Sequence, residues 1–258
     1  MPYAVAADGT RIHYLVEAAP DGPALMLSHA LGVSLEMWEP QMRALARYRV
    51  VRYDSRGHGR SDAPAGPYSF DLLGRDALAV LDAAGVGRTA FCGLSMGGGV
   101  GQWIGANAPE RVDRLVLACT SPTFGTPEVW RQRIDTVLRE GMAAVVPGTI
   151  ERWFTPEYRQ REPEQVRRIE ALLLASSPEG YAGWGAALSE ADFRSGLAQI
   201  AAPTLVIGGA RDSGTPPDKV QELADGIMGA SLVMLEAAHM AGIEQAEGFN
   251  AALERFLA

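Results

Sequence analysis

A serine flanked by glycines is the first candidate for chemistry in this chain. Residues 89–99 read Thr-Ala-Phe-Cys-Gly-Leu-Ser-Met-Gly-Gly-Gly, so Ser95 has a glycine two positions away on either side. A β-prone run precedes it and a helix-like run follows, which is typical of a strained strand-to-helix turn that presents a hydroxyl at the edge of a sheet. The amides and dipole of the helix N-terminus would favour the negative charge that develops when a carbonyl is attacked. The pattern predicts that Ser95 is a nucleophile.

A serine nucleophile needs a base within hydrogen-bond reach. The chain has four histidines, and His239 follows the strand-like run 232–235 and precedes the last helix, so we expect its side chain at the same sheet edge as the serine. His13 lies in an alternating N-terminal hairpin and is predicted to be a surface or half-buried residue. His58 belongs to a Gly-rich turn and is predicted to be structural. His29 ends the first core strand, where we expect it to shape the following loop through its own hydrogen bonds.

The third member of the set must orient the base, and it should come from the end of another strand between the serine and the histidine in chain order. Asp212 meets both conditions. By itself, an aspartate in a Gly-rich loop is typical of a turn. The order Ser95, Asp212, His239, each at the carboxyl end of a predicted strand, indicates a catalytic triad.

Acyl transfer also requires donors for the oxyanion of the tetrahedral intermediate. In this arrangement they are the N–H of the residue after the nucleophile and an N–H from the loop after the first parallel strand. These are the backbone amides of Met96 and Leu31. Because the backbone makes the contribution, the two side chains carry little information about it.

Six short apolar runs recur along the chain, with helical segments between them, and would position these groups. Continuous apolar strands that alternate with helices predict a parallel sheet covered on both faces, the doubly wound α/β class. The first residues predict an antiparallel hairpin over 3–5 and 11–16, with Asp8-Gly9 at its turn. The six runs are 25–28, 50–53, 90–92, 115–118, 204–207 and 232–235.

The strand rhythm stops between residues 118 and 203, and this predicts an insertion into the sheet. Its composition is helical over 127–140, 164–175 and 179–188, with prolines that punctuate these segments. We therefore divide the chain into an α/β core, residues 1–120 and 200–258, and a helical lid, residues 121–199. An insertion at this point would lie over the carboxyl ends of the strands, where open α/β sheets bind ligands.

Composition excludes several classes of function. The 258 residues carry a net charge of −8, whereas nucleic-acid binding requires clustered cations, and an acidic protein is also disfavoured at anionic membranes. The N-terminus lacks the basic start and apolar core of a signal peptide, and the uncharged run 89–109 is too rich in glycine to be a membrane span. Cys92 and Cys119 lie in apolar β-like runs and are predicted to be buried thiols, which fits a cytoplasmic location. We expect no metal and no organic cofactor.

With these residues in place, the chain resembles the α/β-hydrolase family over essentially its whole length. Within that family it is most similar to the 3-oxoadipate enol-lactonases of bacterial aromatic degradation. The similarity in the lid bears on the substrate, because lids vary more than the catalytic core. The matching segments are Met-Trp-Glu-Pro-Gln at 37–41, Arg-Tyr-Asp-Ser-Arg-Gly-His-Gly at 52–59, residues 91–98, and the lid segments 125–133, 140–142 and 152–155.

The resemblance implies that a small carboxylate-bearing enol-lactone is opened through an acyl-enzyme on Ser95. Those lactonases tend to have an Asn-Ser pair where this chain has His29-Ala30, a pair that is also common in esterases. A carboxylesterase, a C–C bond hydrolase and a perhydrolase therefore stay open as alternatives. A small-molecule receptor built on a hydrolase scaffold is a more distant one.

Two lid residues are candidates for substrate binding. Trp130 and Arg133 are three apart on a predicted helix and share a face, whereas Arg131 points elsewhere. Trp130 could pack on the substrate ring and Arg133 could bind its carboxylate, since an acidic protein needs a local cation to hold an anion. The alternative is that Trp130 belongs to an ordinary buried stripe with 134, 137 and 138, and that Arg133 lies on the surface.

Overall fold

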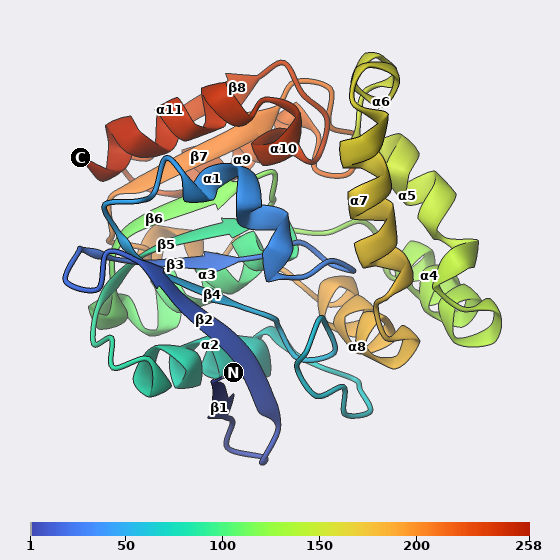
Figure 1. Cartoon of the computed structure of the whole chain (residues 1–258), viewed down its shortest axis with the longest axis horizontal. Coiled ribbons are helices and arrows are strands. Elements are labelled where there is room, and N and C mark those ends of the chain that lie inside the picture. The colour runs from blue at the N-terminus through green and yellow to red at the C-terminus, as the bar shows by residue number, and fades with distance from the viewer. Residues whose placement is uncertain (1) are drawn as a thin grey trace.

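A computed structural model describes residues 2–258 and shows an eight-stranded sheet flanked by helices (Figure 1). Each of the six apolar runs is a strand, and the N-terminal segment adds the antiparallel pair. The strands are β1 Tyr3–Val5, β2 Arg11–Ala18, β3 Ala24–Ser28, β4 Arg49–Tyr53, β5 Thr89–Leu94, β6 Val112–Ala118, β7 Thr204–Gly209 and β8 Ser231–Leu235.

The strand order is β1-β2-β4-β3-β5-β6-β7-β8. In this order, the neighbouring strands β4-β3-β5-β6-β7-β8 all pair in parallel, while β2 runs antiparallel to both β1 and β4. All the parallel strands end at one edge of the sheet, and β5 lies in its middle. This confirms the predicted α/β-hydrolase fold and places the residue after β5 at the centre of that edge.

Helices cover both faces of the sheet, as the continuous apolar strands require. Successive residues of a strand pack into opposite layers: Met26 belongs to the cluster that contains Val100, while Leu25 and Leu27 belong to the cluster that contains Phe249. The core helices are α1 Glu39–Met42, α2 Phe70–Ala83, α3 Met96–Asn107, α9 Pro217–Gly226, α10 Ala241–Glu244 and α11 Ala246–Leu257. Short 3-10 helices occupy Leu35–Trp38, Pro109–Arg111, Met142–Ala144 and Leu197–Gln199.

The segment between β6 and β7 forms a group of helices beyond the carboxyl end of the sheet (Figure 1, yellow-green to gold, at the right). They are α4 Pro127–Glu140, α5 Val146–Trp153, α6 Pro156–Arg161, α7 Pro163–Leu174 and α8 Pro178–Ser189. Proline occupies the first turn of all five, where its missing N–H needs no partner. The prolines that punctuate the sequence therefore mark where these helices begin. Sequence composition alone did not predict α5 and α6.

One prediction for a histidine was wrong. His13 is 2% exposed, not at the surface, and its Nδ1 lies 2.8 Å from Asp54 Oδ2, which is equally buried. The loop after β4 covers this end of β2, since the amide of His13 donates to Ser61 and its carbonyl accepts from Asp54 N. Alternation along a hairpin cannot show that a distant loop covers its second face.

Two further observations concern residues 2–258. Cys92 and Cys119 are free and buried, which confirms the prediction, and burial raises the pKa of both thiols. Within the same residues no helix has the length and apolar character needed to cross a membrane.

Candidate active site

The candidate nucleophile occupies a strained turn between β5 and α3. Ser95 has φ 58° and ψ −116°, a conformation that side chains with a Cβ rarely adopt. The flanking glycines are required by close backbone approach, because a Cβ on Gly93 would lie 2.1 Å from Gly97 O, and one on Gly97 would lie 2.2 Å from Ser28 O. The tightness of the turn requires Gly93, and its packing against β3 requires Gly97, which together explain the spacing of the motif. The turn presents the serine hydroxyl at the sheet edge.

The histidine and aspartate chosen from the sequence meet this serine. His239 Nε2 lies 2.8 Å from Ser95 Oγ, and His239 Nδ1 lies 2.7 Å from Asp212 Oδ2. Asp212 follows β7 and His239 follows β8, so three parallel strands bring the three side chains to one edge. The chain of hydrogen bonds has the geometry in which an imidazole can take the serine proton while the carboxylate fixes its tautomer.

Asp212 is held as a buried carboxylate. Its Oδ1 accepts from the amides of Gly214 at 2.7 Å and Thr215 at 3.1 Å, and its Oδ2 also accepts from Thr215 Oγ1 at 2.7 Å. Burial by itself would raise the pKa of Asp212, but the charge and hydrogen bond of His239 and the donors of Thr215 outweigh it and lower that pKa. The carboxylate thus stays ionised and oriented toward the imidazole.

The two candidate oxyanion donors belong to the residue after the serine and to a turn that lines the same cavity. Met96 is the first residue of α3, so its N–H has no acceptor within its own helix. Leu31 lies in the turn after β3, where the amide of Ala30 is directed to Met37 Sδ at 3.2 Å and that of Gly32 to His58 Nε2 at 2.8 Å. Within residues 2–258 the Leu31 N–H has no protein acceptor, which leaves it available to a ligand.

A cavity of about 240 Å³ opens onto Ser95 and His239, between the sheet edge and the inserted helices. Its walls come from the turn after β3, the loop after β7, and the insertion. Trp153 of α5 lies against the imidazole of His239, with 6.0 Å between the ring centroids, and shields one side of it from water. The lining residues are Leu31, Ser95, Phe124, Gly125, Val129, Trp130, Arg133, Thr149, Arg152, Trp153, Tyr181, Leu188, Ser213, Gly214, Thr215 and His239.

Both lid residues singled out in the sequence line this cavity. The guanidinium of Arg133 lies 5.1 Å from the centroid of the Trp130 ring, so the two share the predicted helix face. Trp130 is 7% exposed, and its Nε1 donates to Phe124 O. Trp130 is therefore buried, as Val137 on the same helix is, and also forms part of the cavity wall. The predicted stripe was wrong at Leu138, which is exposed, and Arg131 lines a separate outer surface.

Sequence reasoning missed a second cation in the cavity, Arg152. Burial lowers the pKa of Arg152, and the nearby charge of Arg133 lowers it further. Within residues 2–258 neither arginine forms an ion pair with a carboxylate, although Arg152 donates to Thr149 Oγ1 at 3.2 Å. Both guanidinium groups also oppose the rise that burial causes in the pKa of Tyr181. Two cations without a carboxylate partner among the described residues, in one small cavity, have the chemistry to hold an anion.

Comparison with known proteins identifies the family. A family model described as the alpha/beta hydrolase fold matches residues 23–246. The chain belongs to the α/β-hydrolase family. It is 39% identical to 3-oxoadipate enol-lactonase 2 of Acinetobacter baylyi over 249 residues, which cover 96% of this chain and 93% of that protein. A Variovorax paradoxus protein with the provisional name of carbamate hydrolase is 34% identical over 96% of both chains.

A solved structure gives the same result. The crystal structure of the enol-lactonase from Burkholderia xenovorans LB400 superposes with a TM-score of 0.97 at 40% identity, and the match covers 99% of each chain. The protein is therefore a hydrolase of the α/β fold that resembles the 3-oxoadipate enol-lactonases.

Proposed function

We propose that this α/β hydrolase opens a small carboxylate-bearing enol-lactone of the 3-oxoadipate enol-lactone type, in aromatic catabolism. The observation that carries the proposal is the placement of Arg133 and Arg152 in the cavity that opens onto Ser95 and His239, where neither has a counter-ion in the part of the chain that the structure describes. A neutral ester would leave two half-buried cations uncompensated, whereas a carboxylate on the substrate would pair with them. The enol-lactonase relatives supply the lactone as the reacting group.

The first half of the reaction follows from the hydrogen-bond chain. His239 Nε2 takes the proton of Ser95 Oγ, and the oxygen attacks the lactone carbonyl. The Leu31 and Met96 amides stabilise the oxyanion. Collapse of the intermediate breaks the ring C–O bond, and the leaving enol oxygen takes the proton from His239. The enol then becomes the ketone while the acyl group stays on Ser95.

The second half uses the same groups. Water enters beside His239, gives it a proton and attacks the acyl-enzyme carbonyl, and the serine leaves with the proton that the imidazole returns. Asp212 stabilises the imidazolium in both halves and does not itself take up a proton. The product is a 3-oxo acid with two carboxylates, one of which was present in the substrate.

The test compares a charged substrate with a neutral one. Purified protein is incubated with enzymatically generated 3-oxoadipate enol-lactone, whose ultraviolet absorbance reports opening, and separately with p-nitrophenyl acetate. Arg133→Met and Arg152→Met should each raise KM for the lactone by roughly 10- to 100-fold, the value of a charge-assisted hydrogen bond, and change acetate hydrolysis by less than about threefold. Arg131→Met is the matched control, because this residue lies on the same helix but faces outward.

Three outcomes contradict parts of the proposal. An unchanged KM for the lactone in both arginine variants would refute the claim that Arg133 and Arg152 bind the substrate carboxylate. Lactone opening by Ser95→Ala at the wild-type rate would refute the acyl-enzyme. A stable lactone together with rapid acetate hydrolysis would keep the triad and assign the protein to the esterase group of alternatives.

A further inference from the structure

Two buried histidines outside the triad connect the turn after β3 with the loop after β4. His58 Nε2 accepts from Gly32 N at 2.8 Å, and His29 Nε2 accepts from Ser55 N at 2.9 Å. A ring nitrogen that accepts from an amide carries no proton, so each neutral imidazole has its proton on Nδ1. His29 Nδ1 therefore donates to Ala30 O at 2.7 Å. The two loops are thus cross-linked in both directions.

His58 is suited to hold an amide permanently. It is 1% exposed, and its ring centroid lies 5.1 Å from that of His29. Burial, with a smaller contribution from His29, lowers the pKa of His58 to about 3. The imidazole is therefore neutral at neutral pH, and its Nε2 stays an acceptor for Gly32 N–H.

This hydrogen bond lies next to the candidate oxyanion donor. The Gly32 N–H belongs to the peptide that follows Leu31, and the Leu31 N–H belongs to the peptide before it, whose Ala30 oxygen accepts from His29 Nδ1 at 2.7 Å. The hydrogen bonds of His58 and His29 therefore hold the two peptides on either side of the Leu31 Cα. The turn is further constrained because the Ala30 amide is directed to Met37 Sδ. Rotation of this turn would move the Leu31 N–H away from the cavity.

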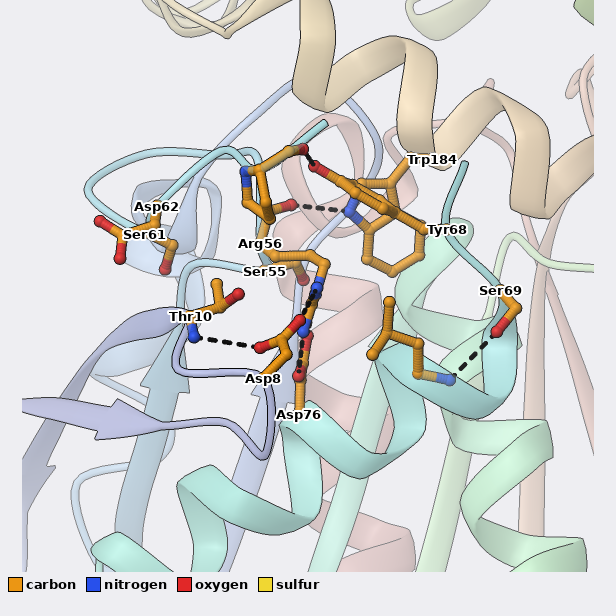
Figure 2. A network of polar contacts seen from close by, with 12 residues as sticks. Asp8, Thr10, Ser55, Arg56, Ser61, Asp62, Tyr68, Ser69, Asp76 and Trp184 are labelled. Atoms are coloured by element: carbon orange, nitrogen blue, oxygen red, sulfur yellow. Dashed lines mark hydrogen bonds and ion pairs between the residues drawn. The ribbon is translucent and has the colours of Figure 1, made fainter. Parts of the chain in front are cut away.

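Lid residues hold the same two loops. Ser176, between α7 and α8, donates from Oγ to Gly32 O at 2.6 Å. Trp184 of α8 is fully buried and donates from Nε1 to Arg56 O at 2.8 Å (Figure 2). His58 Nδ1 lies 3.2 Å from that same Arg56 oxygen, and the Trp184 ring packs edge-on against His58. A continuous set of contacts therefore runs from α8 through Arg56 and His58 to Gly32.

We propose that His58 is a positioning residue for the oxyanion hole: it links Trp184 of the lid to the turn that carries the Leu31 amide, and Ser176 of the lid holds the same turn directly through Gly32 O. The inference rests on the proposed serine mechanism. Packing of the lid then does two things at once: it encloses the substrate, and it stabilises the donor geometry that the tetrahedral intermediate needs. A hydrolase built in this way turns over slowly when α8 is not seated on the core.

The test uses two amides that each replace one nitrogen of the imidazole. In His58→Gln the side-chain oxygen reaches the position of Nε2 and can accept from Gly32 N–H, whereas in His58→Asn it cannot. We expect His58→Asn to lower kcat by roughly 10- to 100-fold with KM within about threefold of the wild type, because a displaced oxyanion donor affects only the transition state. His58→Gln should recover most of that loss.

The lid side is tested by a double-mutant cycle. Trp184→Phe keeps an aromatic ring but removes the donor to Arg56 O, and we expect a smaller loss in kcat of about 3- to 10-fold. Because both residues act through one set of contacts, the His58→Asn/Trp184→Phe double variant should lose little more than His58→Asn alone. A double variant whose fold loss in kcat equals the product of the losses in the two single variants would overturn the inference. If His58→Asn fails to fold, wild-type kcat in both Trp184→Phe and Ser176→Ala would overturn it.

Two controls separate the positioning role of His58 from a general loss of stability and from the serine mechanism. His13→Asn removes another fully buried imidazole but keeps a donor for Asp54, so it should reduce stability and leave kcat within about twofold. Ser95→Ala reports on the serine mechanism itself. An inactive Ser95→Ala with wild-type kcat in His58→Asn would refute the positioning role alone, whereas an active Ser95→Ala would refute the proposed function.

Discussion

Asp76→Asn should destabilise this protein more than any change at a surface ion pair. Arg56 is 1% exposed, and Asp76 accepts from its Nε at 2.5 Å and from its Nη2 at 2.7 Å (Figure 2). Asp8, from the turn of the N-terminal hairpin, accepts from Nη1 at 2.9 Å, and the Tyr68 ring lies 5.6 Å from the guanidinium carbon. The cluster joins the hairpin, the loop after β4 and α2.

The magnitude follows from burial. The side chain of Asp76 is 3% exposed and that of Asp8 is 45% exposed. Asp76→Asn leaves a buried cation without its main partner, which costs about 3–5 kcal/mol of unfolding free energy, whereas a half-exposed pair contributes up to about 1 kcal/mol. Burial by itself would lower the pKa of Arg56, but the hydrogen bonds that it donates to Asp76 and Asp8 raise it. The guanidinium stays charged when Asp76 is replaced, because arginine is not deprotonated in proteins.

The assay is denaturant unfolding at neutral pH, followed by tryptophan fluorescence. The midpoint of Asp76→Asn should fall with an unchanged m-value, and its Tm should drop by roughly 6–20 °C for the same loss of free energy. Asp8→Asn should lower Tm by only a few degrees. Asp71→Asn is the matched control on α2, because its pair with Arg75 is more than half exposed on both sides. Equal losses in Asp76→Asn and Asp8→Asn would refute the burial argument.

Three further predictions concern the site and its support. Asp212→Asn should lower kcat by on the order of 10³- to 10⁴-fold with little effect on Tm, since an amide in place of the carboxylate favours the wrong imidazole tautomer; a loss below about tenfold in steady-state turnover would contradict the assignment. Gly57→Ala should cost about 2–4 kcal/mol in thermal unfolding, because its Cβ would lie 2.4 Å from Gly180 Cα of α8 at a φ of +78°, whereas Gly85→Ala has φ +68° but no such contact and should cost less. The pKa of His58 is about 3 in the folded state against an ordinary 6.5, so its contribution to the free energy of unfolding is complete above pH 6.5 and is lost as pH falls toward 3. Urea unfolding should show a loss of about 2 kcal/mol from this group between pH 6.5 and pH 5, and the loss should be absent in His58→Gln. The same dependence of stability on pH in both proteins would disprove it.

Local sequence determined the fold class and the three residues at the centre of the site. The strands could be found because strands covered on both faces are continuous apolar runs. The serine could be found because its turn tolerates only glycine two residues before it and two residues after it. Asp212 and His239 followed from topology, since parallel strands deliver their carboxyl ends to one edge. Each strand run and the turn around the serine can be read from a short segment of chain.

Tertiary structure decided what depends on contacts between distant segments. Arg152 is one of many arginines in the sequence, and only the folded insertion brings it into the same cavity as Arg133, with neither paired to a carboxylate among residues 2–258. His13 is covered by a loop some 40 residues later in the chain. The hydrogen bond of His58 to Gly32 likewise joins separate loops under a lid that folds from a third segment. Such contacts leave no periodic pattern in the sequence, because charge compensation and burial are properties of the assembled structure.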